Sequence, residues 1–279
     1  MKLIDTHAHI NFAAYKDDFS DVIKRSQKIG MGIINIGTQY STSQQAVSIA
    51  HQYKDIWAAI GTHPINLQEK NIDDFDDNEL LPEEMTTVAE EVDFDKFLNL
   101  AKDNKVVAIG EIGLDYHHFK ENDDINSLKQ KQQEALVKFI DIANEVNKPI
   151  IIHCWDAYED LLKILKTHPA NKKGVIHSFI GGYKTARKFI NLGYAIGING
   201  IATYSDNYKR LIREIELESV VLETDCPYLA PASIRGQRNE PIYVIEVAQF
   251  IADVLEVPLE KVFEKTTINA KRIFGLESV

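Results

Sequence analysis

The chain has 279 residues, of which 44% are hydrophobic and 26% are charged, a composition typical of one large globular domain. No apolar run approaches the roughly 18–20 residues that a membrane-spanning helix needs, so we expect no membrane partner. Met1-Lys2 leads directly into the first apolar run, so we expect no signal peptide and a cytoplasmic protein.

The net charge of −11 comes from a single segment. Positions 71–95 hold eleven acidic residues and no Lys or Arg, which leaves 31 acids against 31 bases in the rest of the chain. The apolar residues of this segment are too few to form a core of their own. We therefore expect one domain over residues 1–279 with an acidic insert at about 71–95, either a solvated loop or a lid that repels stray polyanions.

Short runs rich in Val and Ile recur along the chain without strong alternation, as is typical of parallel strands buried on both faces. Amphipathic stretches with helical spacing lie between them, for example at Phe19–Ile29 and Leu136–Ala143. Eight strand-helix units in a chain of this length predict a (β/α)8 TIM barrel, which typically has about 250 residues. The expected strands are Leu3–His9, Ile33–Ile36, Trp57–Gly61, Val106–Gly110, Pro149–Ile152, Val175–Ile176, Tyr194–Ile198 and Val220–Leu222.

Six of the expected strands carry a metal-binding side chain at or just after their end. On the first strand, His7 and His9 share a face because side chains alternate. A doubly wound sheet would gather its ligands at one crevice, whereas the strand ends of a barrel converge on one mouth, so this distribution favours the barrel. The other side chains are His63, Glu111, His153, His177 and Asp225.

Four of these imidazoles and the two carboxylates form a set of metal ligands: His7, His9, His153, His177, Glu111 and Asp225. This set suits Zn, Mn, Ni or Fe better than Mg or Ca, which prefer oxygen ligands, although Mg²⁺ can also take oxygens from water and a substrate phosphate. These ligands exceed one tetrahedral site, so we expect two divalent ions bridged by Glu111. Such a pair activates water for hydrolysis, and Asp225 can bind one ion and accept the proton of the water.

The chain resembles the TatD family of metal-dependent deoxyribonucleases, which belongs to the amidohydrolase superfamily. The resemblance implies a TIM barrel that hydrolyses DNA phosphodiesters, often from the 3′ end. By position, it implies one ion held by His7, His9 and Asp225, and a second ion held by His153 and His177, with Glu111 between them. The blocks that carry the resemblance are HAHINF at His7, GTHP at Gly61, GEIGLDY at Gly110, IIIHCWDA at Ile150, IHSFIGG at Ile176, ETDCPYLAP at Glu223 and RGQRNEP at Arg235.

The same resemblance implies substrate contacts around the ions. It puts His63 beside the ions, in contact with substrate or phosphate. Arg235 and Arg238, which follow Asp225 in the chain, can each grip a phosphate.

The chain departs from the family pattern at three anion-binding or neighbouring positions. Asn66 stands where the family often has a second His, and His117-His118 stand where Tyr-Arg is usual. Trp155 replaces a usual Arg, so a phosphate clamp loses a charge-assisted contact. Trp155 could stack on a base instead, or simply pack.

We therefore expect a two-metal phosphodiesterase that acts on DNA, on single strands or 3′ ends, with Zn, Mg or Mn as its ions and no obligate protein partner. The alternative is an amidohydrolase-type enzyme that cleaves a small amide, ester or lactone, which the altered anion positions leave open. A nucleic-acid-binding or scaffold protein with a vestigial site is a third hypothesis, and the complete set of ligands argues against it.

Overall fold

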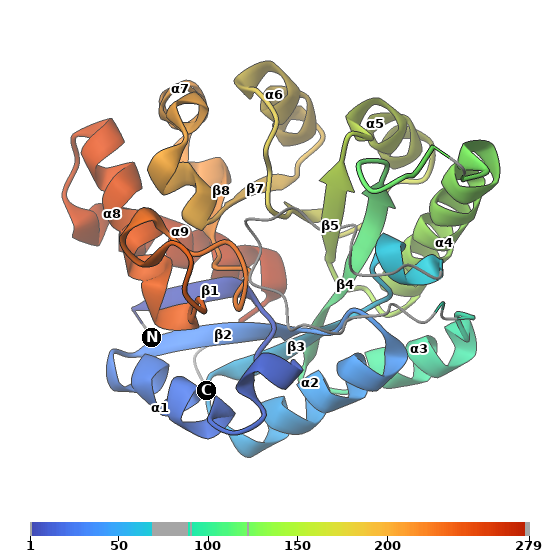
Figure 1. Ribbon diagram of the computed structural model, residues 1–279, viewed down its shortest axis with the longest axis horizontal. Helices are drawn as coiled ribbons and strands as arrows, with labels where there is room; N and C mark the ends of the chain where they lie inside the picture. Colours follow the sequence, from blue (N-terminus) through green and yellow to red (C-terminus); the bar gives the residue numbers. More distant parts are fainter. Residues whose placement is uncertain (1, 69–88, 90, 122, 277–279) are drawn as a thin grey trace.

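The computed structural model describes residues 2–68, 89, 91–121 and 123–276. Within these residues, eight parallel strands pair in sequence order and helices surround them (Figure 1), so the predicted (β/α)8 barrel is confirmed. The strands are β1 (Leu3–Ala8), β2 (Met31–Ile36), β3 (Ile56–Ile60), β4 (Val106–Asp115), β5 (Ile150–Trp155), β6 (Gly174–Ile176), β7 (Ala195–Ile198) and β8 (Val220–Leu222). The helices are α1 (Phe19–Lys28), α2 (Tyr40–Gln52), α3 (Phe94–Ala101), α4 (Ile125–Glu145), α5 (Tyr158–Thr167), α6 (Tyr183–Asn191), α7 (Asp206–Glu214), α8 (Val244–Leu255) and α9 (Leu259–Phe274).

Strand β4 is longer than the sequence pattern predicted. It continues past Gly110 to Asp115, because Gly113 and Asp115 still pair with His153 and Trp155 of β5. The register shifts between Ile109 and Ile112, which is where Glu111 lies. A register irregularity of this kind re-aims side chains, so it frees Glu111 from the strict alternation of the strand.

Most of the acidic insert predicted at 71–95 lies outside the described residues. Its last part is described and belongs to the barrel: the Asp93 carboxylate accepts a hydrogen bond from the Lys96 amide and caps α3. No helix in the described ranges is long and apolar enough to cross a lipid bilayer.

Apolar side chains fill the space between strands and helices, and a second cluster fills the barrel itself. Ile151, Val175 and Val221 belong to the second cluster and precede site residues by two positions, so they share a face with them. Phe274 and Leu276, at the end of α9, pack against this cluster. The polar mouth therefore rests on a dry apolar layer that fixes the strand ends.

The barrel closes at the mouth where the chain after β8 meets β1. The Asp225 amide donates to the His7 carbonyl at 2.8 Å, and the His9 amide donates to the Cys226 carbonyl at 2.8 Å. These two bonds join residues 218 and 217 positions apart in sequence. The hydrogen bonds that close the barrel therefore also bring Asp225 next to His7 and His9.

Helix α9 holds the opposite end of the junction between β8 and β1, which we call the seam. The Asn269 side chain is 4% exposed and donates to the carbonyls of Leu217 and Val220, both at 2.8 Å. The Thr267 hydroxyl donates to the Lys2 carbonyl at 3.1 Å, just before β1. One helix thus satisfies backbone groups at the start of both strands that flank the seam.

We expect Asn269→Ala to lower the free energy of unfolding by about 1–3 kcal/mol, because two buried carbonyls lose their donor. Urea unfolding followed by circular dichroism would measure this change. Ile268→Ala, at a 50% exposed position on the same helix, is the matched control and should stay within about 0.5 kcal/mol of the parent protein. Equal effects of the two substitutions would contradict the role given to Asn269.

Candidate metal centre

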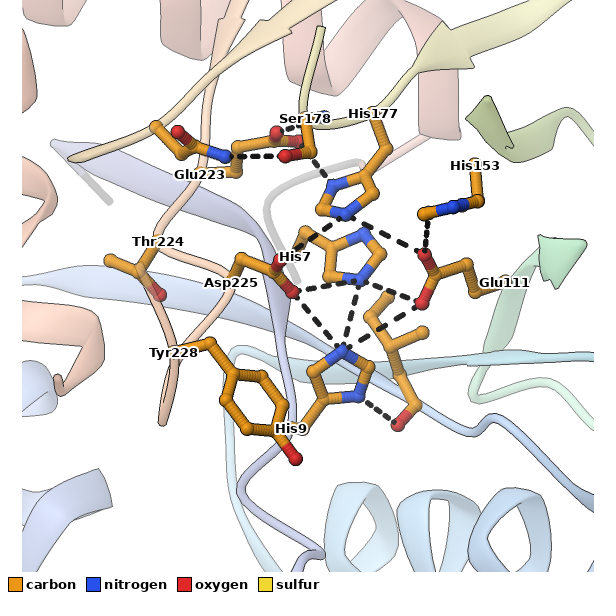
Figure 2. A network of polar contacts seen from close by, with 12 residues as sticks. His7, His9, Glu111, His153, His177, Ser178, Glu223, Thr224, Asp225 and Tyr228 are labelled. Atoms are coloured by element: carbon orange, nitrogen blue, oxygen red, sulfur yellow. Dashed lines mark hydrogen bonds and ion pairs between the residues drawn. The ribbon is translucent and has the colours of Figure 1, made fainter. Parts of the chain in front are cut away.

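The strand ends bring the predicted site residues together at the barrel mouth (Figure 2). His7 and His9 come from β1 and the residue after it, Glu111 from β4, and His153 from β5. His177 follows β6, and Asp225 follows β8. All are buried except Asp225, whose side chain is 14% exposed and thus accessible to solvent.

The two oxygens of Glu111 face different sets of imidazoles. Oε2 lies 3.4 Å from Nε2 of His7 and 3.8 Å from Nε2 of His9. Oε1 lies 3.3 Å from Nδ1 of His153 and 3.6 Å from Nε2 of His177. The carboxylate therefore lies between two groups of ligand atoms, as a bridging ligand would.

Asp225 divides its oxygens in the same way. Oδ1 lies 3.3 Å from Nε2 of His9, and Oδ2 lies 3.5 Å from Nε2 of His177. The backbone of Asp225 has a φ of 59°, a left-handed conformation that is strained for a non-glycine residue. Strain of this kind persists where the surroundings hold it, and here the hydrogen bond to the His7 carbonyl does so.

Hydrogen bonds decide which ring nitrogen of each imidazole can face a metal ion. Nδ1 of His9 donates to the Ile36 carbonyl at 3.1 Å, because a carbonyl can only accept, so its Nε2 carries the lone pair. Nε2 of His153 lies 2.9 Å from the Asp115 carboxylate, which leaves Nδ1 facing Glu111. Each ring thus turns its other nitrogen towards the carboxylates of the centre, as metal ligands with fixed partners do.

His177 and His7 complete this arrangement. Nδ1 of His177 lies 3.1 Å from Oε2 of Glu223, so its Nε2 faces the centre. The rings of His7 and His177 stack at 3.4 Å between centroids, and Nε2 of His7 lies 3.2 Å from Nε2 of His9. So many convergent nitrogens and carboxylate oxygens fit divalent ions of the Zn type.

His63 differs from the other imidazoles. Its Nδ1 accepts a hydrogen bond from the Ile65 amide at 3.2 Å, in the short helix η2 (Pro64–Leu67). The proton of the neutral ring is therefore on Nε2, which lies 3.5 Å from Oε1 of Glu111. Although Nε2 lies close enough to group with Glu111 and His153, a protonated nitrogen donates a hydrogen bond and does not bind a metal ion.

The electrostatics of the centre favour positive charge. Burial would raise the pKa of Glu111, but His63 and the other imidazoles hold it well below its ordinary value. Burial would lower the pKa of His177, but the charges of Glu223 and Asp225 raise it well above its ordinary value. Carboxylates that stay ionised when buried call for a compensating cation at this place.

Burial has the opposite outcome for His63, whose pKa it lowers to about 3. The ring is therefore neutral at physiological pH, in agreement with the hydrogen bond that it accepts from the Ile65 amide. A neutral ring with a fixed N–H pointing towards the carboxylate is suited to donate to an oxygen of a substrate.

Three carboxyl groups support the ligands, and the sequence analysis assigned a role to none of them. Asp115 and Glu223 orient His153 and His177 through the contacts described above. Asp5 accepts from the amides of His7 and Thr224 at 3.1 and 3.0 Å. Burial raises the pKa of Asp5 to about 8, so a neutral carboxyl joins the ends of β1 and β8. The spacing of Asp5 and Glu223, each two residues before a ligand, was the available signal.

A layer of aromatic rings flanks the centre on the β4–β5 side. The Trp155 ring lies 5.4 Å from that of His153 and stacks with that of His118 at 5.6 Å. His118 in turn bonds to Oδ2 of Asp115 at 2.8 Å, the same oxygen that holds His153. Trp155 is half-buried and is in place to line the mouth, and its stacking on a base stays a prediction.

The two arginines predicted to grip phosphate have different surroundings. Arg238 makes a two-pronged ion pair with Asp18 at 2.6 and 2.9 Å and bonds to Glu240 at 3.1 Å. Its charge is already balanced, so the geometry favours a structural role that fixes the loop after β8 to the start of α1. Arg235 is exposed and lies over the Tyr204 ring, 4.7 Å from its centroid.

Comparison with known proteins agrees with this picture. The family model for TatD-related DNases matches residues 4–275. The metal-dependent hydrolase YabD of Bacillus subtilis is 37% identical, over 98% of this chain and 99% of YabD. The metal-dependent hydrolase YcfH of Escherichia coli is 30% identical, over 100% of this chain and 97% of YcfH.

Solved structures show the same fold. YjjV, a TatD homologue from Escherichia coli, superposes with a TM-score of 0.84 at 27% identity, and 99% of each chain is covered. A TatD family hydrolase from Entamoeba histolytica has a TM-score of 0.79 at 23% identity, with 98% of this chain and 97% of that one covered. The second likeness concerns the fold alone.

Gly197 of β7 makes room for the carboxylate that orients His177. A Cβ at this position would lie 2.3 Å from Oε2 of Glu223, which is far too close. We expect Gly197→Ala to displace Glu223 and weaken Zn²⁺ binding about 10–100-fold, as loss of a ligand's orienting partner does. A chelator competition titration would measure this. Gly182→Ala, where a Cβ meets open space, is the control, and unchanged affinity in both variants would refute the role of Gly197.

Proposed function

This chain belongs to the TatD-related DNase family and is a metal-dependent hydrolase, and from this premise we propose that it hydrolyses phosphodiester bonds of DNA, in single strands or at 3′ ends. The observation that carries the proposal is the division of the Glu111 oxygens between two groups of imidazoles. Two-metal sites occur in phosphatases, polymerases and nucleases, where the ions stabilise the attacking and leaving oxygens.

We assign two divalent ions, Zn, Mn or Mg, to these groups. His7, His9 and Asp225 would hold one ion, His153 and His177 would hold the other, and Glu111 would bridge them. Asp225 also turns its second oxygen to His177, so it can contribute to either side. When bound, such ions lower the pKa of a water and stabilise the attacking and leaving oxygens of a phosphodiester.

The protein groups perform the remaining tasks. Asp225 is the most exposed of the carboxylates at the centre and is kept ionised by His177 and His9, so it can accept the proton of the attacking water. The neutral His63 ring can donate a hydrogen bond from Nε2 to an oxygen of the phosphate, where negative charge develops during the reaction. Both groups are fixed in advance by backbone hydrogen bonds, so little reorganisation is needed.

The alternative substrate is a small amide, ester or lactone. Trp155 and the ion-paired Arg238 leave fewer positive groups for a polyanion than the family pattern has. The family favours DNA, and the exposed Arg235 supplies one cation for a phosphate backbone. We therefore rank DNA first.

The deciding experiment uses metal-free protein and single-stranded DNA labelled at the 5′ or the 3′ end. We expect Mg²⁺, Mn²⁺ or Zn²⁺ to restore cleavage, and the two labels to reveal the direction of digestion. Asp225→Asn should lose at least about 10²-fold in rate, because it removes the proton acceptor. If no metal restores cleavage of DNA while a lactone or carboxylate ester is hydrolysed, the amidohydrolase alternative replaces the nuclease.

Metal content separates His63 from the ligands. We expect His63→Ala to keep about two ions per chain and to lose about 10²–10³ in kcat, as removal of one donor to the transition state does. His153→Ala is the comparison variant and should lose one ion. Mass spectrometry of the metals after equilibration with Zn²⁺ gives both numbers, and a missing ion in His63→Ala would make His63 a ligand.

A further inference from the structure

Two loops at the barrel mouth meet and present an exposed tyrosine–arginine pair. Tyr204 ends the short helix η4 (Gly200–Tyr204) after β7, and Arg235 follows the short helix η6 (Ala232–Ile234) after β8. The guanidinium lies 4.7 Å from the ring centroid, and Tyr204 is 40% exposed. Within the described residues, no carboxylate forms an ion pair with Arg235. We call this pair the Tyr204–Arg235 shelf.

Hydrogen bonds fix the shelf to the loops that carry the metal centre. The Asn199 side chain, which caps η4, donates to the Ser178 hydroxyl at 2.9 Å, and Ser178 is the residue after His177. The Ala232 amide donates to the Thr203 hydroxyl at 2.8 Å, which ties η6 to η4. The shelf is therefore held from the β6 side and from the β8 side at once.

Close backbone packing strengthens this attachment. A Cβ at Gly200 would lie 2.1 Å from the Leu229 carbonyl, so only glycine allows η4 to approach the chain after β8. Leu229 follows Tyr228, which lies beside His9 and Asp225 in Figure 2. Helix η4 therefore packs against the chain segment that carries Asp225 and Tyr228.

Pairing distinguishes Arg235 from the other arginine of the same loop. Arg238 is ion-paired with Asp18 and Glu240, whereas among the described residues the Arg235 guanidinium lies over the Tyr204 ring and forms no ion pair. A guanidinium stacked on a tyrosine presents a flat, charged surface, on which a base can stack while a neighbouring phosphate meets the charge. Such combinations are how proteins bind single-stranded nucleic acid without reading its sequence.

We propose that the Tyr204–Arg235 shelf binds an unpaired nucleobase of a single-stranded nucleic acid whose neighbouring phosphodiester lies at the metal centre. The proposal rests on the proposed nuclease function and names the residues that contact a base of its substrate. A base held in a duplex has both faces covered by its neighbours, so it cannot stack on the shelf. Single strands and frayed ends are therefore preferred.

The test compares a single-stranded oligonucleotide with bis(p-nitrophenyl) phosphate, which is too short to reach both sites. We expect Tyr204→Ala and Arg235→Ala to raise KM for the oligonucleotide about 5- to 150-fold, the equivalent of the ~1–3 kcal/mol of one base–aromatic stack. The rate of Tyr204→Ala on the small diester should stay unchanged. Tyr204→Phe should have the KM of the parent protein. Arg235→Lys should raise KM nearly as much as Arg235→Ala, because lysine lacks a planar group.

Arg210→Ala is the matched control. It removes the same kind of pair, a guanidinium 4.6 Å from the Tyr183 ring centroid, from the outer helices α6 and α7. It should leave KM for the oligonucleotide unchanged. An equal rise in KM for this variant would mean that any loss of surface charge weakens binding, and the shelf would be refuted.

An oligonucleotide with one abasic position, moved along the strand, locates the stacked base. At one position the missing base should raise KM of the parent protein but not of Tyr204→Ala. If the parent cleaves DNA and the shelf variants match it on every oligonucleotide, the shelf fails while the nuclease function stands. If the parent neither cleaves nor binds DNA with any metal, both fail together.

Discussion

The structure depends on one electrostatic constraint, the placement of the buried Glu111 and the partly exposed Asp225 among imidazoles. A buried carboxylate is costly unless cations and hydrogen bonds compensate it. Here the ring nitrogens provide that compensation in part, and both carboxylates turn one oxygen to each group of imidazoles. The eight-stranded barrel meets this constraint because it brings distant strand ends to one mouth, above an apolar layer that keeps water out.

The constraint extends outward to the groups behind the ligands. Asp115, Glu223 and the Ile36 carbonyl each lie against one ring nitrogen, so the opposite nitrogen of that ring faces the centre. The same logic separates His63 from its neighbours, because the Ile65 amide donates to its outer nitrogen and leaves the proton on the nitrogen that faces Glu111. Proximity alone groups His63 with Glu111 and His153, and only the hydrogen bond to its far nitrogen distinguishes a donor from a ligand.

Much of the fold could be predicted from the sequence. Runs of Val and Ile indicate buried parallel strands, and candidate ligand residues at the ends of six of these runs favour a barrel. The end of β4 was harder, since pairing of Gly113 with His153 is a long-range effect that no local pattern reveals. The convergence of the six ligand residues was predictable from the barrel. The partners of Arg238 were not, because Asp18 lies 220 residues away in sequence. No sequence pattern pointed to Tyr204, because its contact with Arg235 forms only where the loops after β7 and β8 meet.

Charge explains why stacking matters for this enzyme. The chain carries a net charge of −11, so long-range attraction of a polyanion is weak. If DNA is the substrate, as proposed, its affinity would come from short-range contacts close to the centre: cations held by the carboxylates, the His63 donor and the Tyr204–Arg235 shelf. Contacts of this kind neutralise few phosphates, so binding would depend less on salt than in proteins with a basic groove. An unpaired base can reach such contacts, whereas a base stacked in a duplex cannot, so the proposed substrate contacts favour single strands.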